Sequence, residues 1–107
     1  MRIIARRSLR EFIESKIDHK DYFALKSALE CWFSEVSKAS WNTTQDIKRL
    51  YAHAIIISSD RVVFNIKGND YRLVIAVDFE KSIVWIKWIG TNKAYDQINV
   101  REIEYAK

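Results

Sequence analysis

Proline is absent from this 107-residue chain, which contains only two glycines and one cysteine. Without proline-rich or glycine-rich stretches, and without repeats or low-complexity segments, the chain shows no linker, so we expect one domain spanning residues 1–107. A single cysteine excludes an intramolecular disulfide framework and a cysteine-based zinc site, and it favours a reducing, cytoplasmic compartment. No apolar run has the length of a transmembrane helix, so no membrane association is expected.

Residues suited to acid–base or metal chemistry are also scarce. The two histidines have no carboxylate at metal-ligand spacing, so we predict no metal site and no cofactor. His19 lies in a polar link and is expected at the surface. His53 precedes an apolar run and is expected to be a turn or packing residue, with a role as base at the sheet edge as the alternative. Cys31 lies in an apolar helical pattern and is expected to be buried and structural.

The overall composition of the chain is typical of a packed, moderately basic domain. Hydrophobic residues make up 49% of the chain and include four tryptophans, which is enough for a single core. The net charge of +4 permits an acidic partner such as RNA, although a charge of this size can equally serve solubility.

The order of the predicted elements indicates an α+β fold. Apolar spacing and capping signals predict helices first and strands afterwards, with the N-terminal helices packed on one face of a small antiparallel sheet and the other face left open. The expected elements are a strand at Arg2–Ala5, a helix from a Ser8/Glu11 capping box to Ile17, a helix over Asp21–Ser37 with an apolar stripe of Tyr22, Leu25, Leu29, Trp32 and Val36, a helix over Gln45–Tyr51 capped by Thr43 or Thr44, a buried strand at Ala54–Ser58, and strands from Arg61 onward.

Residues 61–74 read as a β-hairpin with Gly68-Asn69 at its turn, a pair suited to positive φ. This turn sets a register in which Asn65 lies opposite Arg72. Alternation then gives two faces. The apolar face carries Val62, Phe64, Ile66, Tyr71, Leu73 and Ile75, and the polar face carries Arg61, Asn65, Lys67 and Arg72.

A further strand is predicted at Ile83–Ile89, paired with residues 71–78 through a loop at 79–82. This pairing sets Ile86 against Ile75 and Trp88 against Leu73 on the apolar side, and it adds Trp85 and Lys87 to the polar face. A sheet surface with several cations and an indole could hold a phosphate backbone and stack a base. The alternative is a solvated outer face, which an antiparallel sheet is allowed to have.

Residues 61–98 resemble the HigB family of type II toxin–antitoxin toxins, which are small RelE-like ribonucleases that cut messenger RNA on the ribosome. The Asn-Ile-Lys-Gly-Asn-x-Tyr-Arg-Leu-Val segment at 65–74 is the most specific part. Residues 1–12 resemble the opening strand and helix of the family, and further matching positions are Trp32, Glu35, Val36, Lys38, Ala39, Trp41, Asp46, Ile47, Lys48 and Ala54. The resemblance implies a RelE-like fold, mRNA cleavage, growth inhibition, and neutralisation by a HigA-type antitoxin with a helix-turn-helix.

The C-terminal motif of the family, Gly-Thr-His-x-x-Tyr-Asp, reads Gly90-Thr91-Asn92-Lys93-Ala94-Tyr95-Asp96 here. Asn92 therefore replaces the histidine, and an amide cannot exchange a proton near neutral pH. If that histidine is the acid or base of the family, this chain should be slow or inactive.

These observations give a hypothesis for each site residue. Arg72 and Arg61 would stabilise the phosphate, Lys67 or Lys93 would assist, and Tyr95 would stack on a base or transfer a proton. The arginines could instead be salt-bridge partners of helix carboxylates. The proposed RNA contacts are Asn65, Asn69, Lys87 and Trp85, and Asn92 completes the catalytic set. The alternatives to an enzyme are a binding module for RNA, ribosome or antitoxin, and a purely structural protein.

Overall fold

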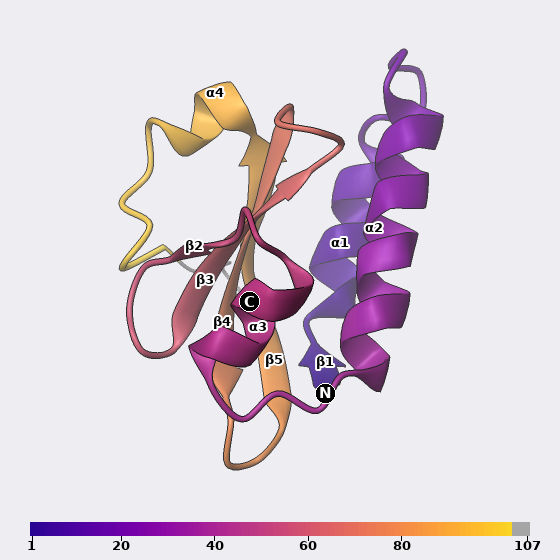
Figure 1. Cartoon of the computed structure of the whole chain (residues 1–107). Helices are drawn as coiled ribbons and strands as arrows, with labels where there is room; N and C mark the ends of the chain where they lie inside the picture. Colours follow the sequence, from indigo (N-terminus) through magenta and orange to yellow (C-terminus); the bar gives the residue numbers. More distant parts are fainter. Residues whose placement is uncertain (104–107) are drawn as a thin grey trace.

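The structure, a computed structural model, describes residues 1–103 and shows the predicted α+β fold (Figure 1). Helices precede most of the strands along the chain. The elements are β1 (Arg2–Ile4), α1 (Arg6–Glu14), α2 (Tyr22–Lys38), α3 (Thr44–Leu50), β2 (Ile55–Ile56), β3 (Arg61–Ile66), β4 (Tyr71–Asp78), β5 (Ile83–Thr91) and α4 (Asn92–Tyr95).

The strands form one sheet with the order β1-β5-β4-β3-β2. β1 pairs with β5 in parallel, whereas the other neighbours are antiparallel, so the sheet is mixed. Helices α1 and α2 lie side by side on one face, and α4 and the chain after it lie on the other (Figure 1). The predicted helix layer on one face of the sheet is confirmed. The strand predicted at Arg2–Ala5 is present as β1, but its parallel pairing with β5 was not predicted.

The β3–β4 hairpin has the predicted register, with Asn65 opposite Arg72 and Phe64 opposite Leu73. All six residues of its apolar face belong to the core under the helices. The turn differs from the prediction, because positive φ occurs at Lys67 (54°) and Gly68 (66°) rather than at Gly68 and Asn69. Lys67 thus adopts the left-handed conformation that few non-glycine residues take, and its side chain leaves the face that alternation assigns to it.

The β4–β5 pair follows the prediction only as far as its middle. Ile86 lies opposite Ile75 as expected, but a β-bulge between Val74 and Ile75 shifts the register, so Trp88 lies opposite Val74 and not Leu73. A one-residue shift moves a side chain to the other face of a sheet. Trp88 therefore belongs to the face turned away from the helices, and its predicted place in the apolar core is wrong.

Helix α2 supplies most of the helix layer. Leu25, Leu29, Trp32 and Val36 are buried as the apolar stripe predicted, while Tyr22 is half-buried. The ring of Trp32 meets that of Phe64 edge-on, with centroids 5.5 Å apart, which joins α2 to β3. Of the two caps predicted for α3, Thr43 or Thr44, the structure has Thr43, because its side chain accepts from the Asp46 N–H in a reciprocal capping box.

Three local predictions are wrong. Helix α1 begins at Arg6 after Ala5, whose φ is 74°, so the predicted Ser8 cap lies inside the helix and Glu11 pairs with Arg7 at 3.0 Å. The predicted buried strand at 54–58 is the two-residue edge strand β2, whose residues are 38% and 37% exposed. The predicted buried thiol of Cys31 is exposed, because it points outward from α2.

Candidate functional site

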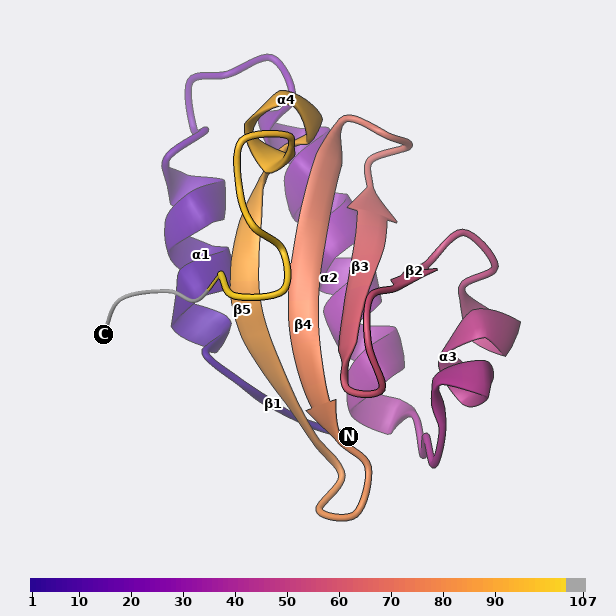
Figure 2. The same cartoon turned by 90° about the vertical axis from the view of Figure 1, so that its left-hand side faces the viewer.

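The face of the sheet turned away from α1 and α2, which we term the outer face, is covered along part of its length. Val63 and Val74 are fully buried although they lie outside the core under the helices. The segment 96–103, which follows α4, crosses this face over β5 (Figure 2). The guanidinium of Arg61 fastens it, since Nη1 donates to the carbonyl oxygens of Val100 (3.1 Å) and Ile103 (3.0 Å). The expectation of a wholly open cationic face is therefore wrong at this end.

The other end of the outer face brings several predicted site residues together. The Cζ of Arg72 lies 5.0 Å from the centroid of the Tyr95 ring, which is a cation–π geometry. Arg72 Nη2 donates to Asn69 Oδ1 at 3.5 Å, and Asn65 lies directly across the strand pair. Arg61 is four residues from Asn65, or about 13 Å along a strand. The two arginines that the sequence placed together thus serve different parts of the face.

Two buried polar atoms at this end have no hydrogen-bond partner among the described residues. They are Asn65 Oδ1, an acceptor, and Arg72 Nε, a donor, and they belong to residues that face each other across β3 and β4. Unmatched buried polar groups are uncommon in folded proteins and each calls for a physical reason. Binding of a polar ligand or water beside this pair would supply the missing partners.

Trp88 joins this group because of the β-bulge. Gly90 lies opposite Arg72, and a Cβ atom at Gly90 would stand 2.5 Å from Trp88 Cη2 and 2.6 Å from Cζ2. The six-membered ring of the indole therefore rests on the glycine backbone. The Trp88 and Tyr95 rings are 6.2 Å apart and tilted by 56°. We refer to Arg72, Trp88 and Tyr95 as the arginine–aromatic cluster. The alternation of apolar and polar residues could not have predicted Trp88 as a member, because a β-bulge cannot be recognised from that alternation.

Helix α4 places the remaining C-terminal residues beside this cluster. The Thr91 hydroxyl caps α4 by accepting from the Ala94 N–H at 3.0 Å. The Asn92 N–H donates to the Asp70 carbonyl at 2.9 Å, which ties α4 to the β3–β4 turn. Lys93 is exposed and Tyr95 half-buried. Asn92 and Lys93 are therefore at the rim of the site, one turn before the stacked Tyr95.

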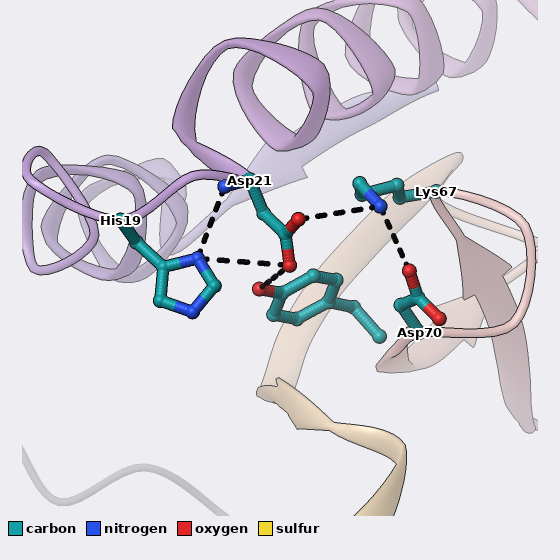
Figure 3. Close-up of polar contacts among 5 residues, drawn as sticks. His19, Asp21, Lys67 and Asp70 are labelled. Atoms are coloured by element: carbon teal, nitrogen blue, oxygen red, sulfur yellow. Dashed lines mark hydrogen bonds and ion pairs between the residues drawn. The ribbon is translucent and has the colours of Figure 1, made fainter.

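Lys67 lies elsewhere, in a group of polar side chains between the β3–β4 turn and the start of α2 (Figure 3). Its ammonium contacts Asp70 Oδ2 at 2.8 Å and Asp21 Oδ1 at 3.4 Å. The Tyr71 hydroxyl donates to Asp21 Oδ2 at 3.0 Å, and His19 Nδ1 is 3.6 Å from the same oxygen. The expectation that Lys67 belongs to the outer face is wrong, because its positive φ turns it toward the helix side.

The ionisation of this group follows from its contacts. Burial raises the pKa of Asp21, but hydrogen bonds from Tyr71 and Lys67, together with the charge of Lys67, outweigh burial and hold that pKa below its ordinary value. The hydrogen bond to Asp70 and the charges of Asp21 and Asp70 raise the pKa of Lys67 despite its partial burial. Lys67 is accordingly held as a cation, which does not suit a residue that must release a proton.

The other predicted residues are more dispersed. Trp85 lies opposite Ala76 on the outer face, and Lys87 occupies the bulge. His53 is exposed and lines a depression of about 290 Å³ at the edge of β3, together with Phe64, Asn65 and Gly68. His19 is at the surface as predicted. Within residues 1–103, no group of three or more His, Cys, Asp or Glu side chains is arranged to hold a metal ion.

The fold and the outer face define the class of protein. Four helices and a five-stranded mixed sheet, with α1 and α2 on one face, form an α+β fold consistent with RelE-like toxins within residues 1–103. The family model of the HigB toxin, the RelE-like toxic component of a toxin–antitoxin system, matches residues 25–98, from α2 to the residues just after α4. The chain belongs to this family.

Membership makes the chain a toxin of a toxin–antitoxin system, and it implies an antitoxin as partner. A search of curated proteins finds no match to the chain. Across the part of the chain that the structure describes, no helix combines the length and apolar character needed to cross a bilayer.

Proposed function

We propose that this toxin is a metal-independent endoribonuclease that cuts messenger RNA on the ribosome in the cytoplasm, stops growth, and is neutralised by a HigA-type antitoxin with a helix-turn-helix. The observation that carries the proposal is the position of Arg72. Its guanidinium is stacked on Tyr95, and Arg72 lies across from Asn65, at the end of the outer face away from the Arg61 contacts with Val100.

The chemistry we propose is attack of a ribose 2′-oxygen on the adjacent phosphorus. The new oxygen–phosphorus bond forms as the bond to the 5′-oxygen breaks, the 2′-hydroxyl loses its proton, and the 5′-oxygen gains one. Arg72 would face the phosphate oxygens, where charge grows in the transition state. Asn65 and Asn69 would hydrogen-bond the RNA. Tyr95 or Lys93 would handle a proton at the rim.

Placement of the substrate by the ribosome would supply much of the rate. In-line positioning is worth several powers of ten when the reacting groups are held close. Among residues 1–103, no histidine lies beside Arg72, because Asn92 stands at the family histidine position and neither His19 nor His53 belongs to the arginine–aromatic cluster. Positioning by the ribosome would allow cleavage without such a histidine. Lys67 does not enter this proposal, because its ion pairs hold it on the helix side.

A second candidate function is a binding module. Asn92 favours it, because its amide cannot exchange a proton, while its backbone bond to Asp70 still holds α4 in place. In that case the outer face would bind RNA, ribosome or antitoxin without cutting.

The test is primer extension on an mRNA translated by purified ribosomes, with the wild-type chain, Arg72→Ala and Asn92→His in parallel. We expect discrete cuts at codon positions, and a loss of about 10²–10³-fold for Arg72→Ala, which is the usual cost of removing one preorganised donor. Arg101→Ala is the matched control, because Arg101 is an exposed arginine outside the site. Cuts from Asn92→His alone would favour the binding module for the natural chain, and no cuts from any variant would overturn the nuclease.

His53→Gln belongs in the same series. His53 lines the depression that also contains Asn65, so it is the histidine with access to this end of the sheet. If cleavage depends on Tyr95, Lys93 and positioning alone, His53→Gln cuts as well as wild type. A large loss would assign the proton transfer to His53.

A further inference from the structure

We infer that Trp88 is the platform on which one nucleobase of the bound RNA stacks, with Arg72 beside it to hold the phosphate of the same nucleotide. The inference rests on the proposed function and names a subsite within it. The sequence pattern assigned Trp88 to the apolar core and not to the site. The bulge at Val74/Ile75 brings it to the outer face.

The indole of Trp88 is supported from beneath by the backbone of Gly90. Its six-membered ring rests on Gly90, where any Cβ would overlap Trp88 Cη2 at 2.5 Å. A flat ring on a glycine backbone is held from below and keeps one orientation. The side chain is only half-buried, so part of the ring surface stays accessible. A rigid, accessible aromatic ring is what a base needs for stacking, and every base has a π-face to offer.

The ring of Trp88 has an aromatic and a cationic side chain as neighbours. Tyr95 flanks it at 6.2 Å, and Arg72 lies over Tyr95 and opposite Gly90. Cationic and aromatic side chains in alternation are typical of proteins that bind single-stranded nucleic acid, where cations meet the backbone and rings meet the bases. The unmatched Nε of Arg72 and Oδ1 of Asn65, two residues that face each other across β3 and β4, add one donor and one acceptor on the outer face.

A purely structural explanation also exists, because an aromatic ring over a strand glycine protects the backbone and stabilises the sheet. The two explanations predict different results. A structural ring affects the free energy of unfolding whatever the RNA contains. A stacking ring affects RNA affinity, and it does so only while the stacked base is present.

The experiment measures binding of the chain to purified ribosomes carrying an mRNA whose unoccupied codon contains 2′-O-methyl nucleotides, which cannot be cut. Each base of that codon is removed in turn. We expect Trp88→Ala to weaken binding about tenfold, a typical effect of removing one stacked base. Removing one particular base should weaken wild type to the same extent, and should not weaken Trp88→Ala further, because non-additivity identifies partners in contact.

Two more variants make the result specific to the ring. Trp88→Phe retains an aromatic face and should keep most of the affinity. Gly90→Ala places a methyl group where the indole rests, so it should weaken RNA binding in the natural background and have no further effect when Trp88 is already alanine. Phe23→Ala, which removes an aromatic ring 79% exposed on α2, should bind as wild type. Circular dichroism melts check that each variant is folded.

The outcomes separate this inference from the proposed function. Suppose that wild type binds and cuts RNA, and that folded Trp88→Ala binds RNA with the same affinity as wild type. This result would overturn the stacking role of Trp88 without affecting the proposal of a nuclease. Binding that depends on Trp88 and on one base, but without cleavage of unmodified RNA, would support the platform and favour the binding module. No binding and no cleavage by wild type would overturn both.

Discussion

At the scale of single residues, neighbours decide what a side chain can do more than its type does. Arg61 and Arg72 lie on the same face of the same hairpin, and the sequence assigned both to the phosphate. In the structure Arg61 donates from Nη1 to two backbone carbonyls, whereas Arg72 stacks on Tyr95 and has an unmatched Nε. Lys67, one residue past β3, is turned by its φ of 54° onto Asp21. These contacts are why we propose the phosphate-binding role for Arg72 and not for Arg61 or Lys67.

Asp21 should stabilise the fold only while it is ionised. Its pKa in the folded state lies below the ordinary value of 3.8, so its contribution is complete above that value and is lost as the pH falls through the folded-state pKa. We expect Asp21→Asn to unfold at lower urea concentration than wild type at pH 7. The difference should shrink below about pH 4, where the unfolded wild-type chain takes up the proton first.

Urea titrations at several pH values measure this, and Asp18→Asn is the control because Asp18 is an exposed carboxylate in the same link. An equal difference between wild type and Asp21→Asn at pH 7 and pH 3 would show that the ionised carboxylate is not the source of the stabilisation.

At the scale of elements, the sequence predicted what alternation and spacing encode. It predicted the stripe of α2 and the β3–β4 register, because apolar residues repeat with the period of each element, and a threonine cap of α3 at Thr43 or Thr44, because a hydroxyl can accept from the first helical N–H groups. It could not predict the bulge that relocates Trp88, since an extra residue in a strand leaves no trace in composition. It also missed β1 beside β5 and the C-terminal segment over the outer face, because long-range pairings are decided by packing.

The C-terminal segment gives a prediction at this scale. Arg61→Ala removes both hydrogen bonds to Val100 and Ile103. We expect it to cost roughly 1.5–3 kcal/mol, the usual range for a hydrogen bond that involves a charged group, and to speed amide hydrogen exchange in residues 97–103. Hydrogen-exchange mass spectrometry and urea unfolding measure the two effects.

Arg101→Ala is the matched control for Arg61→Ala, because it removes the same charge from the segment itself while leaving the Arg61 contacts intact. If Arg61→Ala instead lowers RNA cleavage with no change in exchange, Arg61 acts on the phosphate as the sequence suggested, and the fastening role is wrong.

At the scale of the whole molecule, stability and proposed function occupy opposite sides of one sheet. The helix side holds the apolar core, with Leu25, Leu29, Trp32 and Val36 of α2 packed on the hairpin. The outer face holds the arginine–aromatic cluster. Because the sheet separates them, substitutions on the two sides should have separable effects.

Leu25→Ala tests this separation. Leu25 is fully buried, so we expect a loss of about 2–5 kcal/mol in the free energy of unfolding, the usual range for leucine to alanine in a core. RNA binding by the fraction that remains folded should be unchanged. Urea unfolding and binding measured below the melting transition check both parts, and a matching drop in affinity would show that the helix layer and the outer face are coupled.

The exposed thiol of Cys31 has a practical consequence. It is the single cysteine of the chain, and it lies on α2, on the far side of the sheet from the outer face. A maleimide dye would therefore attach at one defined position, away from Arg72 and Trp88. Energy transfer from that dye to an acceptor on the RNA or on the antitoxin would then follow, in real time, the capture and release of each partner.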